Sequence, residues 1–223
     1  MTQASSTTAF AKSTRPEISG VVPREALFAR LDGTPARCVA WISAPPGYGK
    51  TTLAASYVEA RDYRWAWYQV DRDDDDGETF LHYIAHATRK FRGDGATLPA
   101  FGPEHHGDLA AFARRYFRAL FADATGPTAL VLDDLHELSA DSPLLAILEA
   151  GIAQLPRHCC LVVTSRTPPP VRLARLQPGG QMVCLGVEDL KIKPTELAEM
   201  ARLRGRPLTP DALLPLQQRV SAM

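Results

Sequence analysis

The chain has 223 residues, of which 45% are hydrophobic and 22% are charged, and its 25 basic and 25 acidic side chains leave no net charge at pH 7. This composition is ordinary for a soluble globular protein with a sizeable core. The lack of net charge argues against a chain that coats nucleic acid or an acidic membrane surface. No apolar run approaches the roughly 20 residues that span a bilayer. We therefore expect a cytoplasmic protein without a membrane partner.

The start of the chain differs in composition from the rest. Residues 1–15 are rich in serine and threonine and lack the apolar stretch of a signal peptide. We expect a disordered leader here.

Beyond the leader, short apolar runs alternate with longer amphipathic patterns. The apolar runs predict strands at 38–43, 64–71, 127–134, 159–166 and 181–186. The amphipathic patterns predict helices at 50–62, 78–91, 108–124, 142–155, 195–205 and 209–220, with a loop at 93–107. Strands that are apolar throughout and separated by helices indicate parallel pairing with both sheet faces covered. The predicted fold class is α/β, with a doubly wound, mostly parallel sheet of five strands whose ligands bind beyond the carboxyl ends of the strands.

A phosphate-binding loop is predicted at the end of the first strand. Residues 44–51 read Ala-Pro-Pro-Gly-Tyr-Gly-Lys-Thr, which fits the Walker A spacing G-x-x-x-x-G-K-[ST] with alanine at the first position. In such a loop, backbone N–H groups and the following helix N-terminus bind phosphate. We expect Lys50 between the β- and γ-phosphates and the Thr51 hydroxyl on Mg²⁺. The predicted nucleotide-binding residues of this loop are Gly47, Tyr48, Gly49, Lys50, Thr51 and Thr52.

Two carboxylates close the third expected strand, as in a Walker B motif. Asp133 is placed to hold Mg²⁺ together with Thr51, and Asp134 to orient or deprotonate the attacking water. The order of the motifs places strand 159–166 between this strand and the phosphate-loop strand. With strands numbered along the chain, the predicted sheet order is 5-1-4-3-2, the arrangement of ATPases that carry a catalytic acid after the metal-binding one.

Three further residues follow strands at the same edge of the sheet. Arg166 is expected to point at the terminal phosphate and to stabilise charge in the transition state, with a surface ion pair as the alternative. Asp71 is either a site residue or a cap on the acidic loop that follows it. His136 is more often a hydrogen-bonded structural residue than a catalyst.

Five stretches together resemble one known family. They are VPREAL (22–27), ISAPPGYGKTTLAASYV (42–58), WAWYQVDRDDDDGETFLHYIAHA (65–87), LVLDDLHEL (130–138) and LPRHCCLVVTSRTPPPVRLARL (155–176). In this order and spacing they resemble the nucleotide-binding domain of MalT-like, large LuxR-type transcriptional regulators, which are P-loop ATPases of the STAND class. The resemblance implies ATP or ADP with Mg²⁺ as ligands. It also implies that Arg24 belongs to the nucleotide site, beside adenine and ribose.

The same resemblance implies a domain organisation and a function. We expect a P-loop ATPase domain at 16–187 and an incomplete start of a helical or winged-helix extension at 188–223, ahead of the sensor and helix-turn-helix domains of full-length relatives. The implied function is a nucleotide-dependent switch in transcription regulation that hydrolyses ATP slowly. Its expected partners are a second copy or a regulatory protein, with no direct DNA binding by this chain. The alternative is a stand-alone turnover P-loop ATPase or kinase that acts on a separate substrate. Lys50 and Thr51 do not decide between them, because a switch and a turnover enzyme both need these residues.

Overall fold

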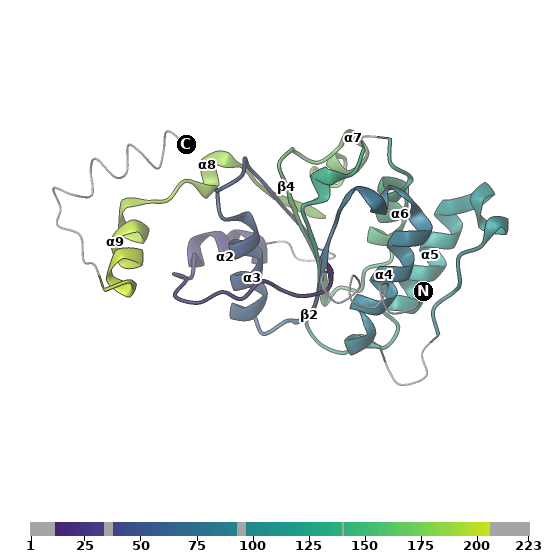
Figure 1. Ribbon diagram of the computed structural model, residues 1–223, viewed down its shortest axis with the longest axis horizontal. Coiled ribbons are helices and arrows are strands. Elements are labelled where there is room, and N and C mark those ends of the chain that lie inside the picture. The colour runs from purple at the N-terminus through teal and green to yellow at the C-terminus, as the bar shows by residue number, and fades with distance from the viewer. Residues whose placement is uncertain (1–11, 34–37, 93–96, 140, 206–223) are drawn as a thin grey trace.

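The computed structural model describes residues 12–33, 38–92, 97–139 and 141–205, and it shows a sheet with helices on both faces (Figure 1). Within these residues the sheet has the strand order β2-β3-β4-β1-β5, and every neighbouring pair is parallel. The strands are β1 (Cys38–Ser43), β2 (Arg64–Gln69), β3 (Thr128–Asp133), β4 (Cys159–Ser165) and β5 (Met182–Leu185). The predicted α/β class and the predicted order 5-1-4-3-2 are confirmed.

The strand register brings the carboxyl ends of the strands to one edge. Ser43 at the end of β1 lies opposite Ser165 at the end of β4, and Gln69 at the end of β2 lies opposite Asp133 at the end of β3. Every residue of β3 and β4 is buried, because helices cover both faces of these central strands. The residues that follow these strands are therefore held by a rigid core.

Two layers of helices cover the sheet (Figure 1). On one face lie α4 (Gly77–Ala87), α5 (Leu109–Leu120) and α6 (Pro143–Ile152), and on the other lie α2 (Glu25–Asp32) and α3 (Lys50–Ala60). Each face has its own hydrophobic core, and the alternation along β1 shows the division: Trp41 packs in the core under α4, α5 and α6, and Ile42 packs in the core under α2 and α3. No helix in the described part of the chain is long and apolar enough to cross a bilayer.

Short helical segments fill the connections between these elements. They are η1 (Arg72–Asp75), η2 (Arg89–Phe91), η3 (Pro103–Asp108), η4 (Leu135–Glu137), α7 (Val171–Ala174), α8 (Val187–Leu190) and α9 (Pro194–Leu203). Several expected elements end early: among them, the strand expected at 64–71 stops at Gln69, and the helices expected at 78–91 and 108–124 stop at Ala87 and Leu120. The strand stops because the Asp71 carboxylate accepts a hydrogen bond from the Asp73 N–H and starts η1. The helix expected at 209–220 and residues 1–11 of the expected leader lie outside the described residues.

The last residues of the expected leader contact the η1 turn and α3. The Lys12 ammonium lies 2.7 Å from the Asp71 carboxylate and 3.3 Å from that of Asp74. Arg15 donates a hydrogen bond to Glu59 on α3 at 2.9 Å. These contacts fasten the segment that precedes α2 to both the η1 turn and α3.

The close packing of α5 against α6 at Gly151 can be tested. A Cβ atom on Gly151 would lie 2.6 Å from Cδ2 of Phe117, whose ring is buried. We expect Gly151→Ala to lower the free energy of unfolding by about 1–3 kcal/mol through overpacking, measured by urea unfolding. Gly107→Ala is the matched control, because a Cβ there meets nothing within 4 Å. Equal stability of the two variants would contradict this packing.

Candidate functional site

The loop between β1 and α3 has the backbone of an anion-binding turn. Gly47 has φ 86° and Gly49 has φ 71°, and both values lie in the left-handed region that glycine adopts without strain. Gly49 is the N-cap of α3, and no side chain caps the helix there. The first N–H groups of α3 and the positive end of its dipole are therefore directed at the loop, which favours a bound anion.

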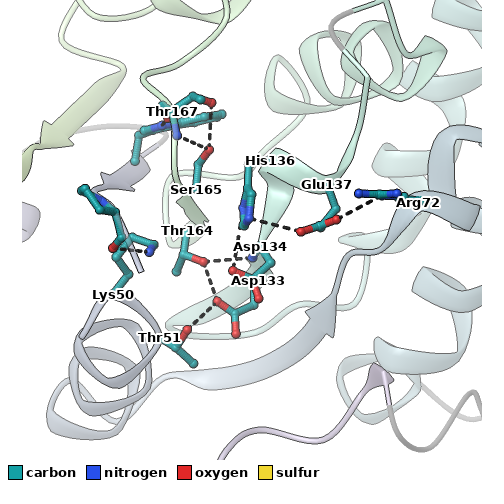
Figure 2. Close-up of polar contacts among 12 residues, drawn as sticks. Lys50, Thr51, Arg72, Asp133, Asp134, His136, Glu137, Thr164, Ser165 and Thr167 are labelled. Carbon is teal, nitrogen blue, oxygen red and sulfur yellow. Dashed lines mark hydrogen bonds and ion pairs between the residues drawn. The ribbon is translucent and has the colours of Figure 1, made fainter. Parts of the chain in front are cut away.

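Lys50 adds a positive charge to this loop. Its ammonium donates a hydrogen bond to the Pro45 carbonyl at 3.2 Å, and the residue is buried (Figure 2). Burial lowers the pKa of Lys50, and the charge of Arg166 lowers it further, while Asp134 acts in the opposite direction. A buried cation at the start of α3 strengthens the preference of the loop for an anion.

Asp133 joins the loop to the strand ends (Figure 2). Its buried carboxylate accepts a hydrogen bond from the Thr51 hydroxyl at 3.0 Å and a second, short one from the Thr164 hydroxyl. Burial raises the pKa of Asp133, and the hydrogen bond from Thr164 opposes that rise. The Thr164 hydroxyl also accepts a hydrogen bond from the Asp134 N–H at 3.0 Å.

The oxygen atoms of this cluster suit a hard divalent cation. Mg²⁺ takes oxygen ligands, commonly one or two protein oxygens with the rest from water and phosphate. Thr51 and Asp133 supply such a pair beside the phosphate loop. The described residues contain no group of three or more His, Cys, Asp or Glu side chains that could hold a metal without further ligands.

Asp134 and His136 lie next to each other behind this cluster (Figure 2). Asp134 has φ 60° and takes the left-handed conformation at the start of η4. His136 Nδ1 lies 3.8 Å from Asp134 Oδ1, and Nε2 lies 3.3 Å from Glu137 Oε1. The His136 side chain is 8% exposed, and neither ring nitrogen makes a hydrogen bond to the described residues. The expected hydrogen bonds of His136 are therefore not found, and the choice between a structural and a catalytic role stays a prediction. Burial, followed by the charge of Arg166, lowers the pKa of His136 and favours neutral imidazole.

Two hollows flank the site. The first has a volume of about 330 Å³ and is mostly apolar, with walls formed by Val21, Val22, Arg24, Pro46, Gly47, Tyr48, Gly49, Thr52, Leu53, Ser56, Leu190, Lys191, Ile192 and Met200. We refer to it as the nucleoside cavity. The second is a polar hollow of about 440 Å³ that is lined by Gln69, Val70, Asp71, Arg72, Asp73, Asp134 and Glu137. The phosphate loop lines the first hollow, and Asp134 lines the second.

The structure brings together most residues that the sequence singled out. Five of the predicted nucleotide residues line the nucleoside cavity, namely Arg24, Gly47, Tyr48, Gly49 and Thr52. Arg166 is exposed at the end of β4, close enough for its charge to act on Lys50 and His136. Asp71 caps η1 and binds Lys12, as the capping alternative predicted. The binding and catalytic roles of these residues stay predictions.

Several residues of the site have no signal in the sequence. The end of strand 159–166 places Thr164 at this edge of the sheet, but its hydrogen bonds with both aspartates have no signal of their own, because a threonine at a strand end is common. Val21, Ile192 and Met200 line the nucleoside cavity from segments far apart along the chain. In residues 188–200, apolar side chains are interspersed with charged ones and form no longer apolar run, so no pattern in this stretch indicates a cavity wall.

A parallel α/β sheet in which a glycine loop joins β1 to a helix that starts Lys-Thr defines a P-loop NTPase fold. Residues 24–166 match the family model described as Nephrocystin 3, N-terminal, and the chain belongs to this family. The sequence resemblance to MalT-like regulators is also confirmed. The chain is similar to the HTH-type transcriptional regulator MalT of Yersinia enterocolitica, with 30% identity over 188 residues that cover 83% of this chain and 20% of that protein.

Other known proteins are similar as well. MalT of Yersinia pestis (strain Pestoides F) is 28% identical over 196 residues, which cover 86% of this chain and 21% of that protein. The chain thus spans about a fifth of the length of the curated relatives that it matches. Among solved structures, domain III of the Thermotoga maritima replication initiation protein DnaA gives a TM-score of 0.43 at 16% identity, covering 100% of this chain and 82% of that one. A DNA replication initiation factor gives 0.43 at 15% identity, with 87% and 53% covered.

The role of Thr164 in holding the two aspartates can be measured. Thr164→Val keeps the shape of the side chain but leaves the buried Asp133 carboxylate and the Asp134 N–H each without one partner. We expect the free energy of unfolding to fall by about 1–3 kcal/mol in urea titrations at neutral pH. Thr164→Ser, which keeps the hydroxyl, is the control and should stay close to the parent. A valine variant as stable as the serine variant would show that these hydrogen bonds contribute nothing.

Proposed function

We propose that the chain is an ATP-binding and slowly hydrolysing switch module of a LuxR/MalT-type transcriptional regulator. One observation carries the proposal: a left-handed glycine loop places the buried Lys50 ammonium and the Thr51–Asp133 pair at the same edge of the sheet, beside an apolar cavity. The loop suits the phosphates, the pair suits Mg²⁺, and the cavity suits a base and ribose. ATP or ADP carries all three of these groups.

The residues divide into a binding set and a hydrolysis set. Lys50 and the N–H groups at the start of α3 would hold the β- and γ-phosphates, and Thr51 with Asp133 would hold Mg²⁺. When bound, Mg²⁺ neutralises charge on the phosphates. Asp134 would accept a proton from the attacking water, and Arg166 would stabilise negative charge on the transferred group.

The comparisons support a regulatory role rather than rapid turnover. The two MalT proteins to which the chain is similar are named as transcriptional regulators. Two parts of the chain also form walls of the nucleoside cavity. One part precedes the sheet along the chain and contributes Val21, Val22 and Arg24, and the other follows it and contributes Leu190, Lys191, Ile192 and Met200. A nucleotide that contacts such segments can favour one arrangement over another, and a full switch needs a difference of about 5.5 kcal/mol between the two states.

In this proposal the chain has two parts and a protein partner. We assign residues 16–187 to the ATPase domain and residues 188–223 to the start of a further helical or winged-helix unit. We propose that the module acts on a second copy or on a regulatory protein, and that it does not bind DNA itself.

The phosphate-loop assignment predicts the behaviour of one lysine. Lys50→Ala removes the buried ammonium, and we expect isothermal titration calorimetry to show loss of ATP binding in a variant that still folds. Lys90→Ala is the matched control, because Lys90 lies over the Trp65 ring at 3.2 Å, outside the loop. If Lys50→Ala binds ATP as well as the parent, the phosphate loop is assigned wrongly.

The hydrolysis assignment predicts that binding and cleavage separate at Asp134. Asp134→Asn keeps the left-handed turn but not the base, so we expect ATP to bind normally while phosphate release stops. Asp62→Asn is the control, because Asp62 is exposed and also has a positive φ, 50°. Parent turnover below about 1 s⁻¹ supports the switch, whereas turnover of about 1–100 s⁻¹ would favour the turnover enzyme.

A further inference from the structure

The helix α9 forms part of the nucleoside cavity without belonging to either core. Figure 1 shows α9 at one end of the molecule, away from the sheet. None of its residues is buried, yet Met200 contributes to the cavity wall. In contrast, the preceding α8 is anchored by Leu190, which is buried in the core around α2 and α3. Apolar packing therefore explains the position of α8 but not that of α9.

Arg24 supplies the contact that places α9. Its Nε donates a hydrogen bond to Glu196 Oε1 at 2.8 Å, and Nη2 donates to Glu196 Oε2 at 3.1 Å. Its remaining donors bind the carbonyls of Leu190 and Lys191, each at 3.0 Å. This is a two-point pairing of a planar guanidinium with a carboxylate, the strongest geometry for such a pair. It joins the residue before α2 to the first turn of α9, 172 positions along the chain.

The pair is shielded from water and pre-arranged. The Arg24 side chain is 10% exposed and that of Glu196 is 16% exposed. Glu196 also accepts the Lys193 N–H at 2.8 Å at the start of its own helix. Burial alone would raise the pKa of Glu196, but the hydrogen bonds from Arg24 and from the Lys193 N–H outweigh it and lower the pKa. The carboxylate is therefore ionised at neutral pH, and the pair persists there.

Arg24 has two possible relations to a nucleotide. It lines the nucleoside cavity and could bind the nucleotide directly, as the family resemblance implied. However, its guanidinium is already bound to Glu196 and to two carbonyls, so a direct contact would have to break some of these bonds. The contacts favour an indirect role, in which Arg24 holds a wall of the cavity in place.

We propose that the Arg24–Glu196 pair is a latch that keeps α9 closed over the nucleoside cavity and thereby sets the rate at which a bound nucleotide leaves. Arg24 is a positioning residue that acts through Glu196. The inference rests on the proposed function, because it requires a nucleotide in the cavity. It adds a residue pair that controls release and that is distinct from Asp134 and Arg166, the residues assigned to hydrolysis.

The test uses the full chain and radiolabelled ADP. The complex is diluted into excess unlabelled ADP, and the label that remains bound is followed by filter retention. We expect Glu196→Gln and Arg24→Gln each to speed dissociation about tenfold, as loss of one charged hydrogen-bonded pair predicts. The double variant should dissociate no faster than either single variant, because both remove the same interaction. Glu199→Gln, on the same helix but in a pair with Arg202 at 4.0 Å, should leave the rate unchanged.

Two further measurements separate the latch from its alternatives. Release of ATP, measured on Asp134→Asn to prevent cleavage, should accelerate by the same factor, because α9 lines the cavity proposed for the nucleoside, which ATP and ADP share. Hydrogen exchange without nucleotide should speed up in α9 of Glu196→Gln and stay unchanged in β3 and β4, which shows that the variant is folded.

The outcomes distinguish the latch from the function on which it rests. If the parent binds ADP but Glu196→Gln releases it at the parent rate, the latch is wrong and the proposed function stands. If only Arg24→Gln speeds release, Arg24 is a direct ligand and the latch is again wrong. If the parent binds no labelled ADP, both proposals fail.

Discussion

The hydrogen-bonded carboxylate of Asp133 is the contact on which the site depends. It ends β3, and it accepts hydrogen bonds from Thr51 on α3 and from Thr164 on β4. A buried carboxylate is unfavourable unless hydrogen bonds compensate for lost water, and the two hydroxyls provide this compensation. Because α3 begins at the glycine loop, the same bonds fix the loop relative to the ends of β3 and β4. The phosphate loop and both aspartates are thus held as one unit.

In this unit, positive charge gathers at the phosphate loop and negative charge gathers around η4. Lys50 and the uncapped start of α3 lie on one side, and Asp134 and Glu137 lie on the other. Neutral His136 separates the two carboxylates without neutralising either. An anionic ligand at the loop would relieve the desolvation of Lys50, whereas a cation would be held only on the aspartate side. The electrostatics therefore fix the orientation of a phosphate–metal pair.

The sequence predicted those parts of the structure that depend on local pattern. Buried strands and amphipathic helices follow from periodicity, and the left-handed turns at Gly47 and Gly49 follow from the loop motif. The contact of Thr51 with Asp133, 82 positions apart, was predictable because parallel strand order determines which ends meet. The Arg24–Glu196 pair was not predictable, because neither residue lies in a periodic element that specifies its partner. The missing hydrogen bonds of His136 depend on side-chain packing, which has no signature in the sequence.

The two ends of the site differ in how they are held, and this difference bears on function. The phosphate end is part of the buried core, so its displacement would disrupt packed strands. The nucleoside end is assembled from segments before and after the sheet, and polar contacts hold α9 there. Such contacts contribute about 0.5–3 kcal/mol each, far less than the core, so opening should be confined to this end. The segment that starts at Lys12 extends from η1 beside Asp134 to the cavity wall at Val22. The segment before the sheet and the helix after it therefore meet at one cavity, which Val22 and Met200 both line, so a ligand there would contact elements from both ends of the described chain.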